Sequence, residues 1–311
     1  MEEKYLHLLD QEVLTFIQET ETFYPADAIH ASIDEQREYY DALCKAYDTG
    51  YPTGVQASDE ILSINASLIT VRNYNFQSEL PKAHVLFFHG GGFVVGGLES
   101  HDSICAEFCA GTKCSVTSVD YRLAPEHPHP ASFDDCLAVY RHLSDRTEIP
   151  IIVVGDSAGG NLAAAVSHAV RGKVRSPQGQ VLIYPALRGD LNKGSYVEHA
   201  NAPLLTTQDI NFYDQIRAGN AAMDSDVIAH PLADQDFSNL PETIIFTAQC
   251  DPLCDDGRDY CDAINRAGGN ATWLCEDGLV HGYLRARTTS KVAKASFGRI
   301  VSAINTLARA V

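Results

Sequence analysis

The feature that most constrains the fold is a series of short apolar segments separated by stretches with helical periodicity. The segments lie at 85–88, 116–119, 151–154, 181–184, 243–248 and 271–275. The first four are almost continuously apolar, which is typical of strands that are buried on both faces of a sheet. Helical patterns at 255–266 and 290–310 continue the alternation. The series therefore predicts an α/β fold whose mostly parallel sheet carries helices on both faces.

Two segments ahead of this series have the period of exposed strands. Residues 61–65 and 68–74 alternate between apolar and polar side chains, which predicts an antiparallel pair and brings the sheet to about eight strands. Before them, apolar residues recur every three or four positions between residues 4 and 48, which predicts two amphipathic helices with a break at Tyr24-Pro25.

One connection in the second half of the chain is longer than the others. It runs from Arg188 to Gly219 and has a helical pattern of its own at 206–216. Long insertions after a strand's carboxyl end tend to be functional. We therefore predict a main domain at 56–311 with an insertion at about 190–218. We expect this insertion and the N-terminal helical region at 1–55, together called the cap, to cover the sheet's active edge.

The net charge and the lack of targeting signals exclude some classes of partner and indicate a location. The 23 Lys and Arg residues are outnumbered by 41 Asp and Glu residues, so the formal charge is -18 and nucleic acid or an anionic membrane would be repelled. The N-terminus lacks the pattern of a signal peptide, and no apolar run reaches the roughly 18 residues that span a bilayer. We expect a soluble, cytoplasmic protein.

The cysteines give no sign of a metal site or a disulfide framework. There are nine, and none of them forms a C-x-x-C pair. The nearest approach to a zinc pattern, Cys250, Cys254 and Cys261, has no pair of histidines to complete it. We expect reduced thiols and no bound metal.

The sharpest chemical motif is Gly155-Asp156-Ser157-Ala158-Gly159-Gly160, which contains G-x-S-x-G. It follows the apolar segment 151–154 and precedes a helix-forming stretch, which is the strand, turn and helix context of a nucleophile elbow. Gly155 and Gly159 allow strand and helix to approach closely, and the strained turn between them exposes the Ser157 hydroxyl. An ordinary glycine-rich turn is the alternative for this pattern taken alone.

A glycine-rich loop, His89-Gly90-Gly91-Gly92-Phe93, follows the segment 85–88. Acyl transfer builds negative charge on a carbonyl oxygen, and backbone N–H groups without side chains beside them can be aimed at it. The alternative is a phosphate-binding loop, but neither G-x-G-x-x-G nor G-x-x-x-x-G-K-[ST] fits this stretch.

A serine nucleophile requires a base, and the base requires a carboxylate that orients it. In proteins with a nucleophile elbow, the triad residues follow one another along the chain in the order serine, acid and histidine. His281 is the last histidine and follows the last predicted strand. Asp251 comes directly after the segment 243–248, and Asp255 is the second candidate because it fits the first turn of the next helix.

Taken together, these motifs resemble the hormone-sensitive-lipase-like branch of the α/β-hydrolases, which includes bacterial short-chain carboxylesterases and acetyl esterases. The matching pieces lie in the family's order from about residue 59: His89 to Phe93, Tyr121-Arg122-Leu123-Ala124-Pro125-Glu126, Gly155 to Asn161, Asp251-Pro252-Leu253 with Asp255 and Gly257, and His281-Gly282. Tyr283 stands where the family commonly has Phe. The resemblance implies an α/β-hydrolase fold with a helical cap.

The resemblance also implies roles for particular residues. The triad would be Ser157, His281 and Asp251, and the oxyanion hole would be the N–H groups of Gly91, Gly92 and Ala158. Supporting roles would fall to His89, Gly90, Asp156 and Glu126. No cofactor or metal is implied, and the family allows a monomer or a homodimer.

The expected reaction is hydrolysis of small-molecule esters with acyl groups from acetyl to about hexanoyl, through an acyl-enzyme on Ser157. An amidase or deacetylase with the same triad is the alternative within enzymes, and a non-enzymatic small-ligand receptor is the alternative outside them. Candidates for the substrate pocket are Phe93, Tyr196 and Tyr283, with Tyr24, Tyr39 and Tyr40 from the first cap segment.

Overall fold

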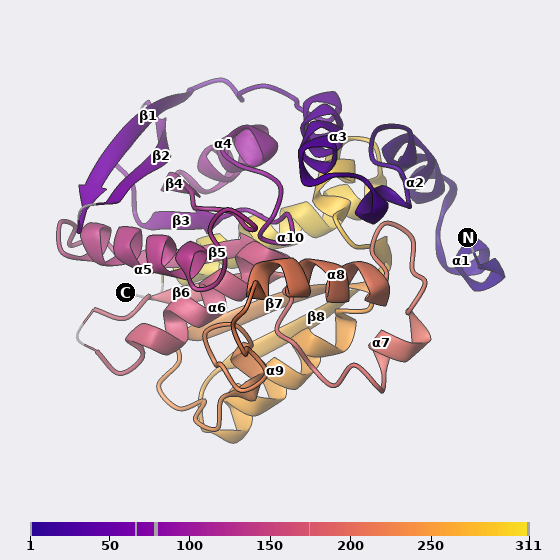
Figure 1. Cartoon of the computed structure of the whole chain (residues 1–311). Coiled ribbons are helices and arrows are strands. Elements are labelled where there is room, and N and C mark those ends of the chain that lie inside the picture. The colour runs from indigo at the N-terminus through magenta and orange to yellow at the C-terminus, as the bar shows by residue number, and fades with distance from the viewer. Residues whose placement is uncertain (1, 66, 78–79, 174, 310–311) are drawn as a thin grey trace.

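A computed structural model describes residues 2–65, 67–77, 80–173 and 175–309, and within these residues the strands form one eight-stranded sheet (Figure 1). The strands are β1 (Val55–Ile64), β2 (Ser67–Phe76), β3 (His84–Phe88), β4 (Ser115–Asp120), β5 (Ile151–Asp156), β6 (Gly179–Ile183), β7 (Glu242–Cys250) and β8 (Ala271–Val280). Their order in the sheet is β1-β2-β4-β3-β5-β6-β7-β8. β1 pairs antiparallel with β2, and β2 pairs antiparallel with β4, whereas strands β3 to β8 run parallel. The predicted fold class is confirmed.

Helices cover both faces of the sheet. The helices on the faces are α4 (Asp102–Thr112), α5 (Ala131–Ser144), α6 (Ala158–Val170), α9 (Cys254–Arg266) and α10 (Lys291–Leu307). Successive side chains of a strand point to opposite faces, and here Val85 and Phe87 join the core under α4 and α10, whereas Leu86 and Phe88 join the core under α5, α6 and α9. Two layers of apolar packing therefore fix the sheet that carries the site.

The N-terminal region differs from the expectation of two helices, because residues 2–46 form three α-helices, α1 (Glu3–Leu8), α2 (Gln11–Phe23) and α3 (Ile33–Ala46), and a short 3-10 helix, η1 (Ala28–His30). The additional break lies at Asp10, whose side chain accepts a hydrogen bond from the Val13 N–H and so begins a new helix. The predicted break at Tyr24-Pro25 separates α2 from α3.

The insertion after β6 contains α7 (Ser195–Glu198) and α8 (Thr207–Ala218). Hydrogen bonds join α8 to the N-terminal region: the Tyr213 hydroxyl lies 2.5 Å from the Tyr24 hydroxyl and donates to Gln36 Oε1 at 3.1 Å. Two segments that are far apart in the sequence therefore meet above the sheet.

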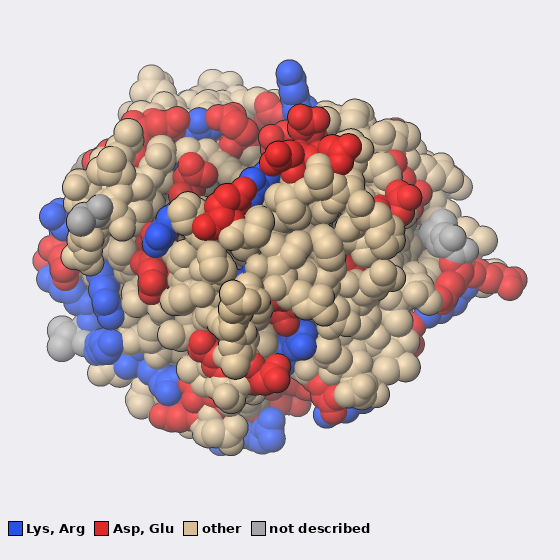
Figure 2. Space-filling view, in the orientation of Figure 1, with Lys and Arg blue, Asp and Glu red and all other residues tan. Residues whose placement is uncertain are grey.

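Acidic side chains are spread over the face shown in Figure 2, and Lys and Arg are most frequent at its left edge. Within the described ranges, no helix is both long enough and apolar enough to span a bilayer.

Candidate active site

Ser157 lies on the turn between β5 and α6, in a conformation that few non-glycine residues adopt. Its φ is 54° and its ψ is -117°. The turn is possible because neighbouring glycines permit close backbone contacts: a Cβ at Gly159 would lie 1.9 Å from the Phe88 carbonyl oxygen. A Cβ at Gly155 would lie 2.2 Å from the Gly159 carbonyl oxygen. The two glycines of the G-x-S-x-G motif therefore allow the close approach of strand and helix that the sequence predicted.

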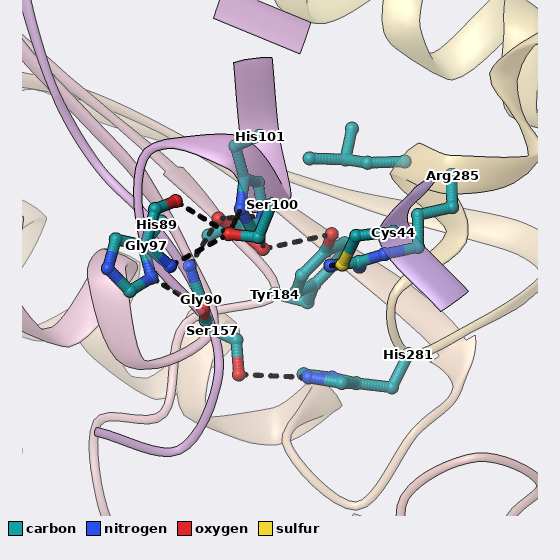
Figure 3. Close-up of polar contacts among 12 residues, drawn as sticks. Cys44, His89, Gly90, Gly97, Ser100, His101, Ser157, Tyr184, His281 and Arg285 are labelled. Atoms are coloured by element: carbon teal, nitrogen blue, oxygen red, sulfur yellow. Dashed lines mark hydrogen bonds and ion pairs between the residues drawn. The ribbon is translucent and has the colours of Figure 1, made fainter. Parts of the chain in front are cut away.

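The side chains of Ser157, His281 and Asp251 form a continuous hydrogen-bonded chain. The Ser157 Oγ lies 2.9 Å from His281 Nε2, and His281 Nδ1 lies 2.7 Å from Asp251 Oδ2. Figure 3 shows the first of these contacts between Ser157 and His281. Asp251 is fully buried, and its second oxygen accepts the Leu253 N–H at 2.9 Å, which fixes the carboxylate.

The other candidate acid, Asp255, faces elsewhere. Its carboxylate accepts the Ser195 N–H at 3.1 Å and pairs with Arg258 at 2.8 Å. The structure therefore brings Asp251, and not Asp255, to the histidine.

The glycine loop presents its backbone next to Ser157. Gly91 and Gly92 have φ values of 133° and 59°. In the described part of the chain, no protein acceptor takes the N–H of Gly91, Gly92 or Ala158. A Cβ on Gly91 would lie 2.1 Å from the Val95 carbonyl oxygen, and one on Gly92 would lie 2.7 Å from the ring of Tyr213. Only glycine fits this loop, and its free donors remain available to a ligand.

Asp156 holds the glycine loop from behind. Its carboxylate accepts the Gly90 N–H at 2.8 Å, lies 3.2 Å from His101 Nε2 and accepts the Tyr184 hydroxyl at 3.4 Å. Burial by itself raises the pKa of this carboxyl, but His101 and the other neighbouring donors outweigh that effect and lower it to about 2. Asp156 is therefore a buried anion that positions the loop.

Figure 3 also shows polar contacts around His89, Gly90, Ser100 and His101, and Ser100 Oγ lies 2.8 Å from His101 Nδ1. His89 donates from Nδ1 to the Gly90 carbonyl at 2.8 Å and stacks on Tyr121 with ring centroids 4.2 Å apart. Burial lowers the pKa of His89 to about 4, so the ring is neutral at neutral pH. His101 was missed by sequence reasoning because no motif marks it, and only the fold brings it beside Asp156.

Glu126 supports the loops through Arg37 of α3. The Arg37 guanidinium binds both oxygens of Glu126 at 2.8 and 2.7 Å. It also donates to the carbonyls of Val94 and Ala124 at 3.0 and 3.2 Å. The side chain thus ties the glycine loop, the loop after β4 and the N-terminal region together.

This ion pair predicts a pH-dependent contribution to stability. The hydrogen bonds from Arg37 lower the pKa of Glu126 from 4.5 to about 2, so the contribution is fully present above 4.5 and is lost as the pH falls toward 2. We expect Glu126→Gln to lower the melting temperature at neutral pH, and we expect the gap to wild type to close as the pH is lowered. The Glu126 side chain is 52% exposed, so solvent screening keeps the gap small.

Thermal unfolding followed by circular dichroism at several pH values measures the gap. Glu148→Gln is the matched control because the Glu148 side chain is 93% exposed and forms only a long contact of 3.4 Å with Arg175. A gap for Glu126→Gln that stays constant with pH would contradict the prediction.

A cavity of about 360 Å³ opens above Ser157. Ser157, His281, Gly91, Gly92 and Ala158 line it. Helices α2, α3 and α8 contribute much of the remaining wall, including Phe16, Thr20, Tyr40, Leu43, Ile210 and Tyr213.

The predicted pocket residues fall into two groups. Phe93, Tyr196, Tyr24 and Tyr40 line the cavity, as expected. Tyr283 does not: it is fully buried under the sheet, where Ser296 and Tyr283 share a hydrogen bond of 2.8 Å. The pocket assignment of Tyr283 was wrong because the chain turns at Gly282, where φ is 74°, and sends the next side chain into the core.

Tyr39 also lies off the cavity wall, with its ring 6.4 Å from that of Tyr24. Its neighbour Tyr40 lies on the cavity side of α3. Sequence reasoning missed the three arginines that line the cavity, Arg188, Arg217 and Arg285. None of them belongs to a motif.

Comparisons with known proteins identify the family of this chain. A family model described as the alpha/beta hydrolase fold matches residues 85–285. The chain is 36% identical over 230 residues to a carboxylesterase, NlhH, of Mycobacterium tuberculosis, which covers 71% of this chain and 72% of that protein. It is 31% identical over 233 residues to an ethyl acetate hydrolase of Pseudomonas putida, covering 72% of this chain and 73% of that protein.

Among solved structures, an ester hydrolase from the metagenome of Lake Arreo, in complex with a derivative of bipyridine phosphonate, superposes with a TM-score of 0.88. The two chains are 29% identical, and the match covers 96% of this chain and 98% of that one. The fold, the family model and these relatives agree. The chain belongs to the alpha/beta hydrolase family, in its hormone-sensitive-lipase-like branch of carboxylic ester hydrolases.

Proposed function

We propose that the protein hydrolyses esters of short-chain carboxylic acids through an acyl-enzyme on Ser157. The observation that carries the proposal is the hydrogen-bonded chain from Ser157 through His281 to Asp251, which opens into a cavity beside free backbone donors. The names of the relatives, a carboxylesterase and an ethyl acetate hydrolase, support the same class of reaction.

In the proposed mechanism each group has a role in the first half of the reaction. Ser157 Oγ attacks the carbonyl carbon while its proton passes to His281 Nε2. Asp251 stabilises the resulting imidazolium through Nδ1. The N–H groups of Gly91, Gly92 and Ala158 bind the oxyanion, and each such donor lowers the barrier by about 3 kcal/mol.

Collapse of the tetrahedral intermediate completes acylation. The proton on His281 passes to the leaving alcohol, the carbon–oxygen bond of the ester breaks, and the acyl group remains on Ser157. A water molecule then gives a proton to His281 and attacks the acyl carbon. The bond from that carbon to Ser157 Oγ breaks, the proton returns from His281 to Ser157 Oγ, and the acid is released. All of these residues come from one chain, so the chemistry is compatible with a monomer or a homodimer.

The cavity supports the preference for short acyl groups. Its volume of about 360 Å³ lies near the lower end of the range for small-ligand sites. We infer that residues 1–55 and about 190–218 act as the cap of this cavity, because α2, α3 and α8 line it. The ring of Tyr213 lies directly over Gly92 and limits the height available beside the oxyanion donors.

Initial rates on p-nitrophenyl esters from acetate to dodecanoate test the preference. We expect the largest kcat/KM between the acetyl and hexanoyl esters, with a steep fall for longer chains. A matched p-nitroanilide tests the amidase alternative, and we expect it to be hydrolysed far more slowly than its ester. A maximum at dodecanoate would contradict the pocket size, and an anilide that reacts as fast as its ester would favour the amidase.

A further inference from the structure

A second group of charged residues lies in the same cavity as Ser157. It consists of Arg188, Arg217 and Asp214, with Asn161 and His230 beside them, and all five line the cavity. We call this group the arginine subsite. The proposed mechanism gives this group no role, and its two cations stand out in a protein whose formal charge is -18.

Arg217 is a buried cation without a carboxylate partner. Its side chain is 2% exposed, donates to the Ala229 carbonyl at 3.0 Å and to Asn161 Oδ1 at 3.2 Å, and stacks over the Phe93 ring at 3.6 Å. Among the described residues, none forms an ion pair with it, and its Nε has no hydrogen-bond partner. Burial lowers the pKa of Arg217 to about 10, so the group stays positive at neutral pH.

Arg188 lines the same cavity as Arg217 and Ser157. It follows β6 by a short loop in which the Ala186 N–H donates to the Ser157 carbonyl at 3.2 Å. In the described part of the chain, the one recorded partner of its guanidinium is Asp214, at 2.8 Å. A guanidinium has five N–H donors, so Arg188 keeps donors for a ligand in the cavity that it lines.

The charges of the subsite do not balance. Asp214 is shared between Arg188 and His230, whose Nε2 lies 3.4 Å from Asp214 Oδ1. The other carboxylate near Arg217, Asp226, accepts from His129 at 2.9 Å instead. Within the five residues of the subsite, two guanidinium groups therefore stand beside one carboxylate. Of the other carboxylates that line the cavity, Asp209 accepts two hydrogen bonds from Thr206 at 2.8 Å. Buried charges are normally paired, because an unpaired one costs several kcal/mol of solvation.

We propose that the arginine subsite binds a carboxylate of the substrate, so that the preferred esters carry a negative charge a few bonds from the scissile carbonyl. This inference rests on the proposed esterase function and specifies its substrate class. A planar guanidinium matches a carboxylate with two parallel hydrogen bonds, and Arg188 supplies such a fork while Arg217 adds positive charge behind it. The charge sits either on the acyl side or on the alcohol side of the ester.

Two matched pairs of esters distinguish these sides. Monomethyl glutarate against methyl valerate places the charge on the acyl side, and 4-acetoxybenzoate against 4-methylphenyl acetate places it on the alcohol side. Acid release at constant pH gives kcat/KM for each ester. We expect the anionic member of one pair to be hydrolysed at least as fast as its neutral partner, although the net charge of the protein would repel it.

Variants link that preference to the subsite. We expect Arg188→Gln to lower the ratio of anionic to neutral kcat/KM by about tenfold, the effect of losing a hydrogen bond between charged groups. We expect Asp214→Asn to raise the same ratio, because it frees Arg188 from its competing carboxylate. Arg266→Gln is the matched control, because it removes the same charge from an exposed position of α9. We expect it to leave kcat/KM unchanged for the anionic and the neutral esters.

The outcomes separate this inference from the proposed function. If the neutral esters react but the anionic members of both pairs react at least tenfold more slowly, the subsite is only a structural ion-pair network and the inference is overturned. The same conclusion follows if Arg188→Gln and Asp214→Asn shift the ratio in the same direction. If no neutral ester reacts, the esterase proposal itself fails. Melting temperatures of each variant identify any that does not fold.

Discussion

Replacing Ser157 by alanine is expected to lower kcat on short p-nitrophenyl esters by about 10⁶-fold, which is the loss seen when the nucleophile of such a triad is removed. The reason is that His281 and Asp251 act only through the Ser157 hydroxyl, whose oxygen lies 2.9 Å from His281 Nε2. The fold should persist, because alanine suits the turn at φ 54° as well as serine does and removes no bond that anchors the backbone.

The control for this variant is Ser302→Ala, which removes an exposed hydroxyl from α10 and should keep full activity. An aryl fluorophosphonate that labels serine nucleophiles adds an independent readout. We expect one covalent adduct on wild type, located at Ser157 by peptide mass, and none on Ser157→Ala. Substantial turnover by a folded, unlabelled Ser157→Ala protein would show that another group attacks the ester.

The parts of the molecule that sequence predicts well are those set by local chemistry. Four apolar segments became β3 to β6 because burial on both faces requires runs of this composition, whatever the rest of the chain does. The Ser157 turn was equally predictable, since its sterics are satisfied by glycines two positions away on either side. Asp251 could be preferred to Asp255 as the acid of the triad because it directly follows a predicted strand, whereas Asp255 fits the first turn of the next helix.

The parts that sequence did not predict depend on contacts between distant segments. His101 meets Asp156, 55 positions later in the chain, only because the fold brings the turn before α4 to the carboxyl end of β5, and no spacing rule connects them. Arg188 and Arg217 lie in different elements that meet at the cavity. Tyr283 was wrongly assigned to the pocket because the sequence of a loop does not show in which direction each side chain points. In the structure the chain turns at Gly282, where φ is 74°, and the Tyr283 side chain lies in the core.

Gly91→Ala should have the second largest effect on catalysis, a loss of about 10² to 10³ in kcat, comparable to removal of an oxyanion donor. The added methyl group would lie 2.1 Å from the Val95 carbonyl oxygen, and the φ of 133° is one that alanine rarely adopts. The loop must therefore shift. Its N–H groups then no longer point at the oxyanion, whereas Ser157, His281 and Asp251 stay in place.

Gly298→Ala provides the matched control for the same chemical change. Gly298 lies on the exposed side of α10, and a Cβ there meets nothing within 4 Å. We expect this variant to keep wild-type kcat and to gain up to about 1 kcal/mol in stability, because alanine is the better helix former.

Fluorophosphonate labelling shows whether a loss of activity in Gly91→Ala comes from a shifted glycine loop or from a disrupted triad. The reagent needs the nucleophile, so we expect every folded Gly91→Ala molecule to be labelled at Ser157, at a reduced rate. The binding constant for a product alcohol should change little, since an alcohol develops no negative charge beside the oxyanion donors. If kcat of Gly91→Ala matched that of Gly298→Ala, the glycine loop would not be the oxyanion hole, and the donors that stabilise the transition state would have to come from another element around Ser157.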